Sequence, residues 1–199
     1  MELEIRKLTP DLMNDYLHFF DHIAFTDHQE WSGCYCVAHH IHNERFLEDL
    51  PKGSLAIGRD YAIDFIKHGK LQGYLAYNSG EVVGWCNVND RQNYESLEAW
   101  KELPGWKEVL SDWQKRIKSI MCFVIAPHMR GKGIATTMLG RICDDSLAEG
   151  CEFVEAYPYE GEQNTYNCTG HVAMYEKQGF TTLQKVEHLL VMRKHFGNK

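Results

Sequence analysis

Apolar and polar residues change their spacing early in the chain. Leu3, Ile5 and Leu8 lie in a short opening segment that predicts a β-strand. After Thr9 and Pro10, which suit the start of a helix, apolar side chains recur from residue 12 to residue 23 at helical steps. The chain therefore opens with a strand followed by an amphipathic helix.

The middle of the chain predicts a β-hairpin and a buried strand. Two β-rich runs, 73–77 and 81–88, flank the turn residues Asn78, Ser79 and Gly80. Residues 119–125 are continuously apolar, and the run is short enough for a central strand. Helices are predicted at 61–68 and 133–149, because each of these patterns ends at a glycine.

The last third of the chain adds more strands. Residues 153–157 predict a strand parallel to 119–125, since a helix lies between the two. A short helix that contains Val172 and Tyr175 ends at Gly179, and β-rich runs follow at 181–186 and 189–193. We therefore expect one α/β domain over residues 1–199, a mixed central sheet with helices on both faces. Residues 27–70 and 90–118 are less regular.

Composition narrows the class of protein. The chain has 199 residues, of which 44% are apolar, and 28 acidic against 21 basic residues give a net charge of −7. This balance disfavours a nucleic-acid partner. The seven cysteines are an odd number and are scattered through the chain, which argues against a disulfide framework. No apolar run approaches the length of about 18 residues that spans a membrane, and the N-terminus lacks a secretory pattern. We expect a cytoplasmic protein with reduced thiols and no membrane partner; monomer and homodimer both stay open.

The most informative segment lies between the buried strand and the helix that follows it. A helix N-terminus offers unpaired N–H groups and the positive end of the helix dipole, which suits a phosphate. Gly131 and Gly133 allow close approach of an anion, and Arg130 and Lys132 add charge. A plain turn is the alternative. The two common nucleotide fingerprints do not fit, because glycine follows Lys132 and position 136 is threonine.

Two ordered motifs resemble one known family. The string Arg130-Gly131-Lys132-Gly133-Ile134-Ala135 resembles the Arg/Gln-x-x-Gly-x-Gly/Ala signature of the GNAT superfamily of acyl-CoA N-acyltransferases. The downstream segment 174–180 resembles the Tyr-x-x-x-Gly-Phe segment of the same superfamily. The resemblance covers residues 73–193 and the opening strand and helix, and it implies a GNAT-like fold.

The resemblance also implies a reaction. Acetyl-CoA would be the co-substrate, with its pyrophosphate on the amides of 130–135 and its pantetheine along Phe123, Val124 and Ile125. A primary amine, carried by a small molecule or a peptide, would attack the thioester directly through a tetrahedral intermediate whose oxyanion is held by a backbone N–H of that strand. The irregular stretches 27–70 and 90–118 would elaborate the acceptor site.

The resemblance implies a general acid for the reaction, but it does not identify a general base. Tyr175 matches the tyrosine that protonates the departing thiolate in many members, although a tyrosine on an apolar helix position is commonly a packing residue. The predicted strand 119–125 contains no acid. Glu81, Asp90 and Glu155 are candidates for the general base, but each is expected to be a surface charge, so a water-relayed deprotonation is the working hypothesis.

Cysteine positions set this chain apart from the family pattern. Many members have an asparagine seven residues before the tyrosine, where this chain has Cys168, with Asn167 beside it. Cys34 and Cys36 resemble the Cys-x-Cys of a bacterial subgroup. His39, His40 and His42 follow them, so a zinc site is an alternative, but the spacing is tighter than in familiar structural zinc sites and no metal is expected.

Three functions therefore remain on the sequence alone. An acetyl-CoA-dependent N-acetyltransferase is favoured by the two motifs. A non-catalytic acyl-CoA sensor or partner module is favoured only by the missing strand carboxylate, and a zinc-binding regulator only by the Cys and His residues.

Overall fold

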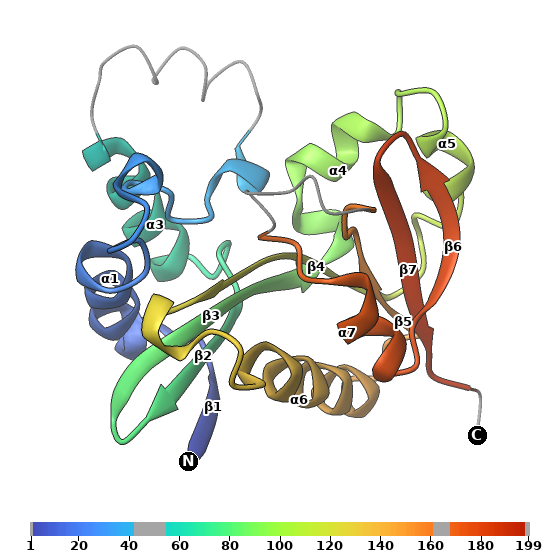
Figure 1. Ribbon diagram of the computed structural model, residues 1–199. Coiled ribbons are helices and arrows are strands. Elements are labelled where there is room, and N and C mark those ends of the chain that lie inside the picture. Colours follow the sequence, from blue (N-terminus) through green and yellow to red (C-terminus); the bar gives the residue numbers. More distant parts are fainter. Residues whose placement is uncertain (1, 42–54, 161–167, 198–199) are drawn as a thin grey trace.

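The computed structural model describes residues 2–41, 55–160 and 168–197. Its centre is a sheet of seven strands in the order β1-β2-β3-β4-β5-β7-β6 (Figure 1). Only β4 and β5 run parallel to each other, and every other neighbouring pair is antiparallel. The strands are β1 Leu3–Lys7, β2 Gly73–Asn78, β3 Glu81–Asp90, β4 Ile117–Ile125, β5 Phe153–Ala156, β6 Thr181–Val186 and β7 Leu189–His195.

Six α-helices are seen in the described part of the chain. They are α1 Met13–His22, α3 Leu55–Lys67, α4 Glu95–Trp100, α5 Trp106–Val109, α6 Ile134–Ala148 and α7 Val172–Lys177. The predicted helices at 61–68 and 133–149 correspond to α3 and α6, and α3 begins earlier than its apolar pattern indicated. Helix α6 is the crossover that parallel strands require between β4 and β5.

Helices cover both faces of the sheet, as predicted. The ring of Trp85 on β3 meets Tyr16 of α1 edge to face, with 4.8 Å between ring centroids. The preceding residue, Gly84, faces the other way, because a Cβ built on it would lie 3.3 Å from Ile134 Cγ2 of α6 and 2.9 Å from Ile125 Cδ1. Successive residues of a strand point to opposite faces. Glycine at 84 therefore lets α6 approach the sheet.

Residues 90–118 are more ordered than their sequence pattern indicated. They form a short 3₁₀ turn and the helices α4 and α5, which enclose a second apolar core of their own. In that core Trp100 packs on Trp106 with 4.5 Å between ring centroids, and Tyr157 and Val186 contribute from the sheet side. No helix within the described residues is long and apolar enough to cross a membrane.

Candidate active site at the splayed strands

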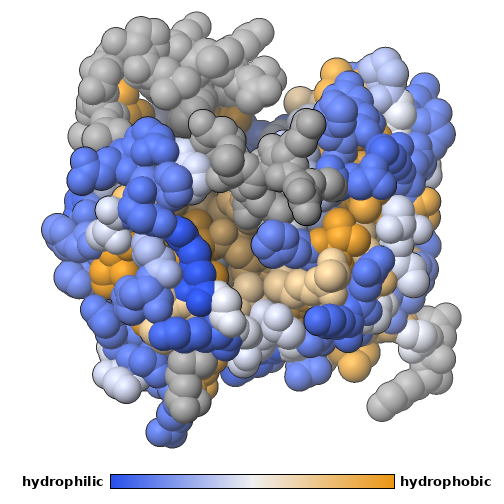
Figure 2. Space-filling model, in the orientation of Figure 1, coloured by the Kyte–Doolittle hydropathy of each residue, from blue (hydrophilic) through white to orange (hydrophobic). Residues whose placement is uncertain are grey.

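Strands β4 and β5 separate halfway along β4. Their pairing runs from Ile117 opposite Phe153 to Ile120 opposite Ala156, where β5 ends, whereas β4 continues to Ile125. Figure 2 shows that this face of the molecule is hollowed near its centre, with apolar surface on the floor of the hollow. The second half of β4 is thus left without its β5 neighbour, as the family resemblance implies for the cofactor strand.

The loop after β4 has the geometry expected of an anion site. Gly131 and Gly133 have φ angles of +73° and +80°, in the left-handed region where glycine carries no steric cost. Gly133 caps α6, a helix of 15 residues. None of the hydrogen bonds found among the described residues uses the N–H of Gly131, Lys132 or Gly133. These amides and the helix N-terminus are therefore free to bind a phosphate group.

The two basic side chains of the loop differ. The Arg130 guanidinium donates to Asp27 at 2.5 Å and to the carbonyl of Ile125 at 3.2 Å. This ion pair holds the pKa of Asp27 below its usual range. Lys132 is exposed, and its ammonium contacts only Met129 Sδ, at 3.5 Å, among the side chains described. Lys132 therefore supplies the uncompensated positive charge of the loop.

Tyr175 is fully buried on α7. Its hydroxyl donates to the carbonyl of Thr169 at 2.6 Å, and its ring packs against Phe180 with 5.2 Å between centroids. Gly170, with φ +83°, passes so close that a Cβ there would lie 3.2 Å from the Tyr175 hydroxyl. Burial raises the pKa of Tyr175 well above its ordinary value, so the phenol keeps its proton.

The same short segment also reaches β4. The N–H of Phe123 donates to the carbonyl of Cys168 at 2.5 Å. Residues 168 and 169 thus accept hydrogen bonds from the strand amide and from the tyrosine that the resemblance assigned to the reaction. The structure brings Phe123 and Tyr175 together through this segment, which sequence reasoning noted only as a departure from the family pattern.

Several thiols next to this segment contact one another in successive pairs and do not converge on one point. Cys36 Sγ lies 3.2 Å from Cys122 Sγ on β4. The Cys122 thiol also interacts with Cys168, and Cys34 interacts with Cys36. In the described part of the chain, no three Cys, His, Asp or Glu side chains are placed to hold one metal ion.

The histidines of the same region have other contacts. His39 Nδ1 lies 3.2 Å from Ser96 Oγ, and His40 Nε2 lies 3.4 Å from the side-chain amide of Asn87. Burial, with help from the nearby His39, lowers the pKa of His40 to about 4, so this ring is neutral at pH 7. His42 lies outside the described residues.

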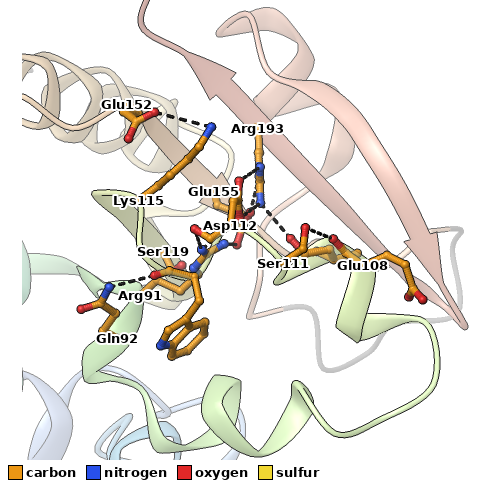
Figure 3. Close-up of polar contacts among 12 residues, drawn as sticks. Arg91, Gln92, Glu108, Ser111, Asp112, Lys115, Ser119, Glu152, Glu155 and Arg193 are labelled. Carbon is orange, nitrogen blue, oxygen red and sulfur yellow. Dashed lines mark hydrogen bonds and ion pairs between the residues drawn. The ribbon is translucent and has the colours of Figure 1, made fainter.

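The expectation of a surface charge is wrong for Glu155. Its carboxylate has no exposure, and it accepts a hydrogen bond from Tyr157 at 2.5 Å. Another comes from Arg193 Nε, and Arg91 Nη1 lies 3.6 Å away (Figure 3). Arg193 and Arg91 also both bind Asp112. Two arginines from distant parts of the chain therefore compensate the buried charge. The residues next to Glu155 in the sequence do not indicate that its carboxylate is buried.

The other two candidate bases lie at the ends of β3. Glu81 is exposed, and Asp90 is exposed and paired with Lys118 at 3.0 Å. Neither is held in the splayed region by a hydrogen bond found here. Both have the surface positions expected from the sequence.

A cavity of about 570 Å³ lies between the irregular stretches of the sequence. It shares no lining residue with the loop 130–135 or with β4. Its lining comes from the turn that follows α3, from the 3₁₀ turn before α4 and from α4 itself, namely His68, Gly69, Lys70, Gln92, Asn93, Glu95, Glu98 and Ala99.

Comparison with known proteins gives a family and a fold. A family model described as "Acetyltransferase (GNAT) family" matches residues 37–180. No curated protein sequence matches the chain.

Similar solved structures include PaiA N-acetyltransferase from Thermoplasma acidophilum in complex with coenzyme A (14% identity, 98% of this chain and 100% of that chain, TM-score 0.57). Polyamine N-acetyltransferase from Drosophila melanogaster (11% identity, 98% and 100%, TM-score 0.56) is also similar. So is ribosomal-protein-alanine N-acetyltransferase from Brucella melitensis (17% identity, 97% and 99%, TM-score 0.52). At these identities the likeness concerns the fold.

Proposed function

Since the chain belongs to the acetyltransferase (GNAT) family, we propose that it transfers an acetyl group from acetyl-CoA to a primary amine. One observation carries this proposal. Strand β4 loses its β5 neighbour after Ile120, and the same strand leads directly into a loop whose glycine amides are free at a helix N-terminus. A long ligand with a thioester at one end and a phosphate at the other fits this arrangement, in which a strand edge without a β5 partner leads into a loop with free amides.

Different residues are proposed to bind the pyrophosphate, the pantetheine and the oxyanion of acetyl-CoA. The loop 130–135 (Arg130, Gly131, Lys132, Gly133, Ile134 and Ala135) would bind the pyrophosphate. The free N–H groups of residues 131–133 at a helix N-terminus favour anions, and Lys132 adds charge. The edge of Phe123, Val124 and Ile125 that faces away from β3 has no β5 partner and would bind the pantetheine amides. The Phe123 N–H would stabilise the oxyanion once it exchanges its present bond to Cys168.

Tyr175 is the proposed general acid. Its raised pKa keeps the phenol protonated, and its hydroxyl lies on the segment that also holds the Phe123 amide. A proton held at this hydroxyl can pass to a departing CoA thiolate when the bond to Thr169 is exchanged.

Deprotonation of the amine is assigned to water. Glu155 is a poor candidate for the base, because Tyr157, Arg193 and Arg91 already surround its carboxylate. Glu81 and Asp90 lie at the exposed ends of β3. If Glu81, Asp90 or Glu155 relays the proton, its amide variant shifts the acidic limb of the pH–rate profile.

The acceptor is proposed by class only. The net charge of −7 favours a cationic amine, and the solved structures of similar fold include enzymes named for polyamines and for a ribosomal protein alanine. We assign the acceptor site to the two irregular stretches of the sequence, 27–70 and 90–118, whose segments 68–70 and 92–99 contribute the residues that line the cavity. Membership of the Cys-x-Cys subgroup stays a prediction.

The decisive experiment has two parts. Calorimetry with acetyl-CoA should show binding, and a panel of amines, including polyamines and peptides with free N-termini, should release CoA with at least one member. Binding without release by any amine would contradict the catalytic proposal. It would favour a non-catalytic acyl-CoA-binding module, which the occupied Phe123 amide also supports. No binding at all would contradict both.

A further inference from the structure

We propose that Cys36 and Cys122 are a thiol pair that hydrogen peroxide converts into a disulfide, which joins the segment after α1 to the second half of β4. All seven cysteines are free thiols in the structure, so the disulfide is a second covalent state of the protein. The inference goes beyond the proposed function and does not depend on it, because neither acetyl-CoA nor an amine takes part in the step.

The two sulfurs are already close. Cys36 Sγ lies 3.2 Å from Cys122 Sγ, although the two residues are 86 positions apart in the sequence. A disulfide bond is about 2.05 Å long, so the sulfurs need to approach each other by only about 1 Å. Both side chains are buried, so the pair is enclosed by the protein.

Buried side chains fix the backbone at Cys36. Asn87 Nδ2 donates to the carbonyl of Cys36 at 2.8 Å, and the Tyr16 hydroxyl donates to the carbonyl of Tyr35 at 2.5 Å. Asn87 lies opposite Cys122 in the register of β3 and β4, and side chains of opposite residues share one face of the sheet. The residue that holds Cys36 is therefore the cross-strand neighbour of Cys122, which accounts for the meeting of the two sulfurs.

The backbone of Cys36 is also strained. Its φ is +50°, in the left-handed region that residues other than glycine seldom adopt. Such a conformation persists only where the surrounding structure imposes it, and it is concentrated at functional sites. Helix α3 presses on the same segment, because a Cβ built on Gly58 would lie 2.5 Å from the carbonyl oxygen of Gly33. The segment is thus clamped between α3 and the sheet, with its strained residue against β4.

The two thiols differ in acidity in a way that suits successive roles. Hydrogen bonding with Cys122 and Cys34 outweighs burial and holds the pKa of Cys36 well below its ordinary value. Hydrogen bonding with Cys168 and Cys36 raises the pKa of Cys122. Since the thiolate is the form that attacks a peroxide, Cys36 is the sulfur oxidised first, and Cys122 is the thiol that resolves it.

The step consumes one molecule of hydrogen peroxide. The Cys36 thiolate bonds to one peroxide oxygen as the O–O bond breaks, which gives a sulfenic acid and hydroxide, and the hydroxide takes up the proton that Cys36 had lost. The Cys122 sulfur then bonds to the Cys36 sulfur as the S–O bond breaks, and that oxygen leaves as water with the Cys122 proton. Two thiols are oxidised to one disulfide, and the peroxide is reduced to two waters.

Peptide mapping without reductant tests the pair. The full chain is treated with a limited amount of hydrogen peroxide, its remaining thiols are alkylated, and it is digested. We expect a cross-linked peptide that joins Cys36 to Cys122, absent before treatment and lost on reduction with dithiothreitol. Cys36→Ser and Cys122→Ser should each lose this peptide, and Cys143→Ser, which removes another buried thiol, should keep it.

Urea denaturation then shows whether the fold accommodates the bond. The oxidised protein should unfold at a higher urea concentration than the same protein reduced with dithiothreitol, because the bond closes a loop across 86 positions of the unfolded chain. Cys122→Ser should show no such increase after the same treatment.

Three results would overturn the inference. They are a peroxide-treated folded protein without the cross-linked peptide, a disulfide formed instead through Cys34 or Cys168, and an oxidised protein that unfolds at a lower urea concentration than the reduced one. Should a serine variant fail to fold, the wild type and Cys143→Ser still give the mapping. Acetyl-CoA binding and CoA release are measured on the reduced protein, so the proposed function and the thiol pair succeed or fail separately.

Discussion

The two halves of β4 differ in what holds them. From Ile117 to Ile120 the strand has β3 on one side and β5 on the other, and beside it Glu155, Arg193 and Asp112 form a buried network of ion pairs. From Met121 to Ile125 it keeps β3 but has no β5 residue opposite, and the Phe123 amide bonds instead to the short segment at Cys168. The first half is held by two strand neighbours and buried ion pairs, and the second by β3 and one hydrogen bond that a ligand would replace in the proposed function.

We call residues 117–120 the closed half of β4 and residues 121–125 its open half. The contrast between them separates stability from chemistry along a single strand. Removing a partner from the first half should leave a buried charge alone and destabilise the fold. Removing one from the second half should alter binding or turnover while the fold persists.

The largest expected effect is on the closed half. Glu155→Ala leaves Arg193 and Arg91 without their shared carboxylate, so we expect it to lower the free energy of unfolding by about 3–5 kcal/mol. Urea denaturation measures the loss. Glu152→Ala, which removes an exposed partner of Lys115, should cost less than about 1 kcal/mol. Equal losses in the two variants would mean that the buried network does not hold this half.

The next effect is on turnover in the open half. Tyr175→Phe keeps the ring but removes the hydroxyl proton, so kcat should fall by about 10²-fold while acetyl-CoA affinity stays near that of the wild type. The loss should shrink at high pH, where a thiolate leaves more easily. Tyr74→Phe, which removes a hydroxyl bound to Asp145 away from the splay, is the control. Full activity at neutral pH with an unchanged alkaline limb would show that Tyr175 only packs.

The third effect is a pH dependence of the free energy of unfolding, caused by His40 next to the open half. His40 touches Asn87, which lies opposite Cys122, and its pKa is about 4 in the fold against about 6.5 when unfolded. The unfolded chain therefore binds the extra proton, and stability is lost as the pH falls from 6.5 toward 4.

His40→Gln should remove about 2 kcal/mol of the wild-type decrease in unfolding free energy between pH 7 and pH 5. Denaturation at both pH values measures it, with the exposed His188→Gln as the control. Parallel curves for wild type and His40→Gln would mean that His40 is accessible to protons in the fold.

The smallest effect tests the loop that ends the open half. Gly133→Asp places a side chain and a negative charge at the cap of α6, where φ is +80°, and acetyl-CoA should bind at least about tenfold more weakly, or 1.4 kcal/mol. Gly140→Asp adds the same charge to open space on the same helix and should change affinity less. Unchanged affinity in folded Gly133→Asp would refute this site for the pyrophosphate.

Local pattern sufficed for most elements of the fold. The hairpin follows from two β-rich runs around a glycine-containing turn, the buried strand from its continuous apolar run, and the crossover helix from its spacing and its terminating glycine. The position of the loop proposed for the pyrophosphate follows in the same way, from Gly131 and Gly133 between strand and helix.

Long-range partners could not be predicted in this way. Glu155 is buried because Arg91 and Arg193, which are far from it in sequence, come to the same place. The thiols of Cys36, Cys122 and Cys168 meet for the same reason, and their types and spacing along the chain carry no sign of it. The alternating pattern locates a side chain on one face of a strand, but the neighbour that compensates its charge depends on the whole topology.

The hydrogen bond from the Phe123 amide to Cys168 has a kinetic consequence. In the free protein this amide already has an acceptor. With the proposed role of the amide as oxyanion donor, the form ready for a thioester is the fraction in which that bond is broken. The measured dissociation constant then equals the intrinsic constant divided by that fraction. At high acetyl-CoA the observed rate of productive association should reach a plateau, set by how often the Cys168 carbonyl releases the amide rather than by diffusion.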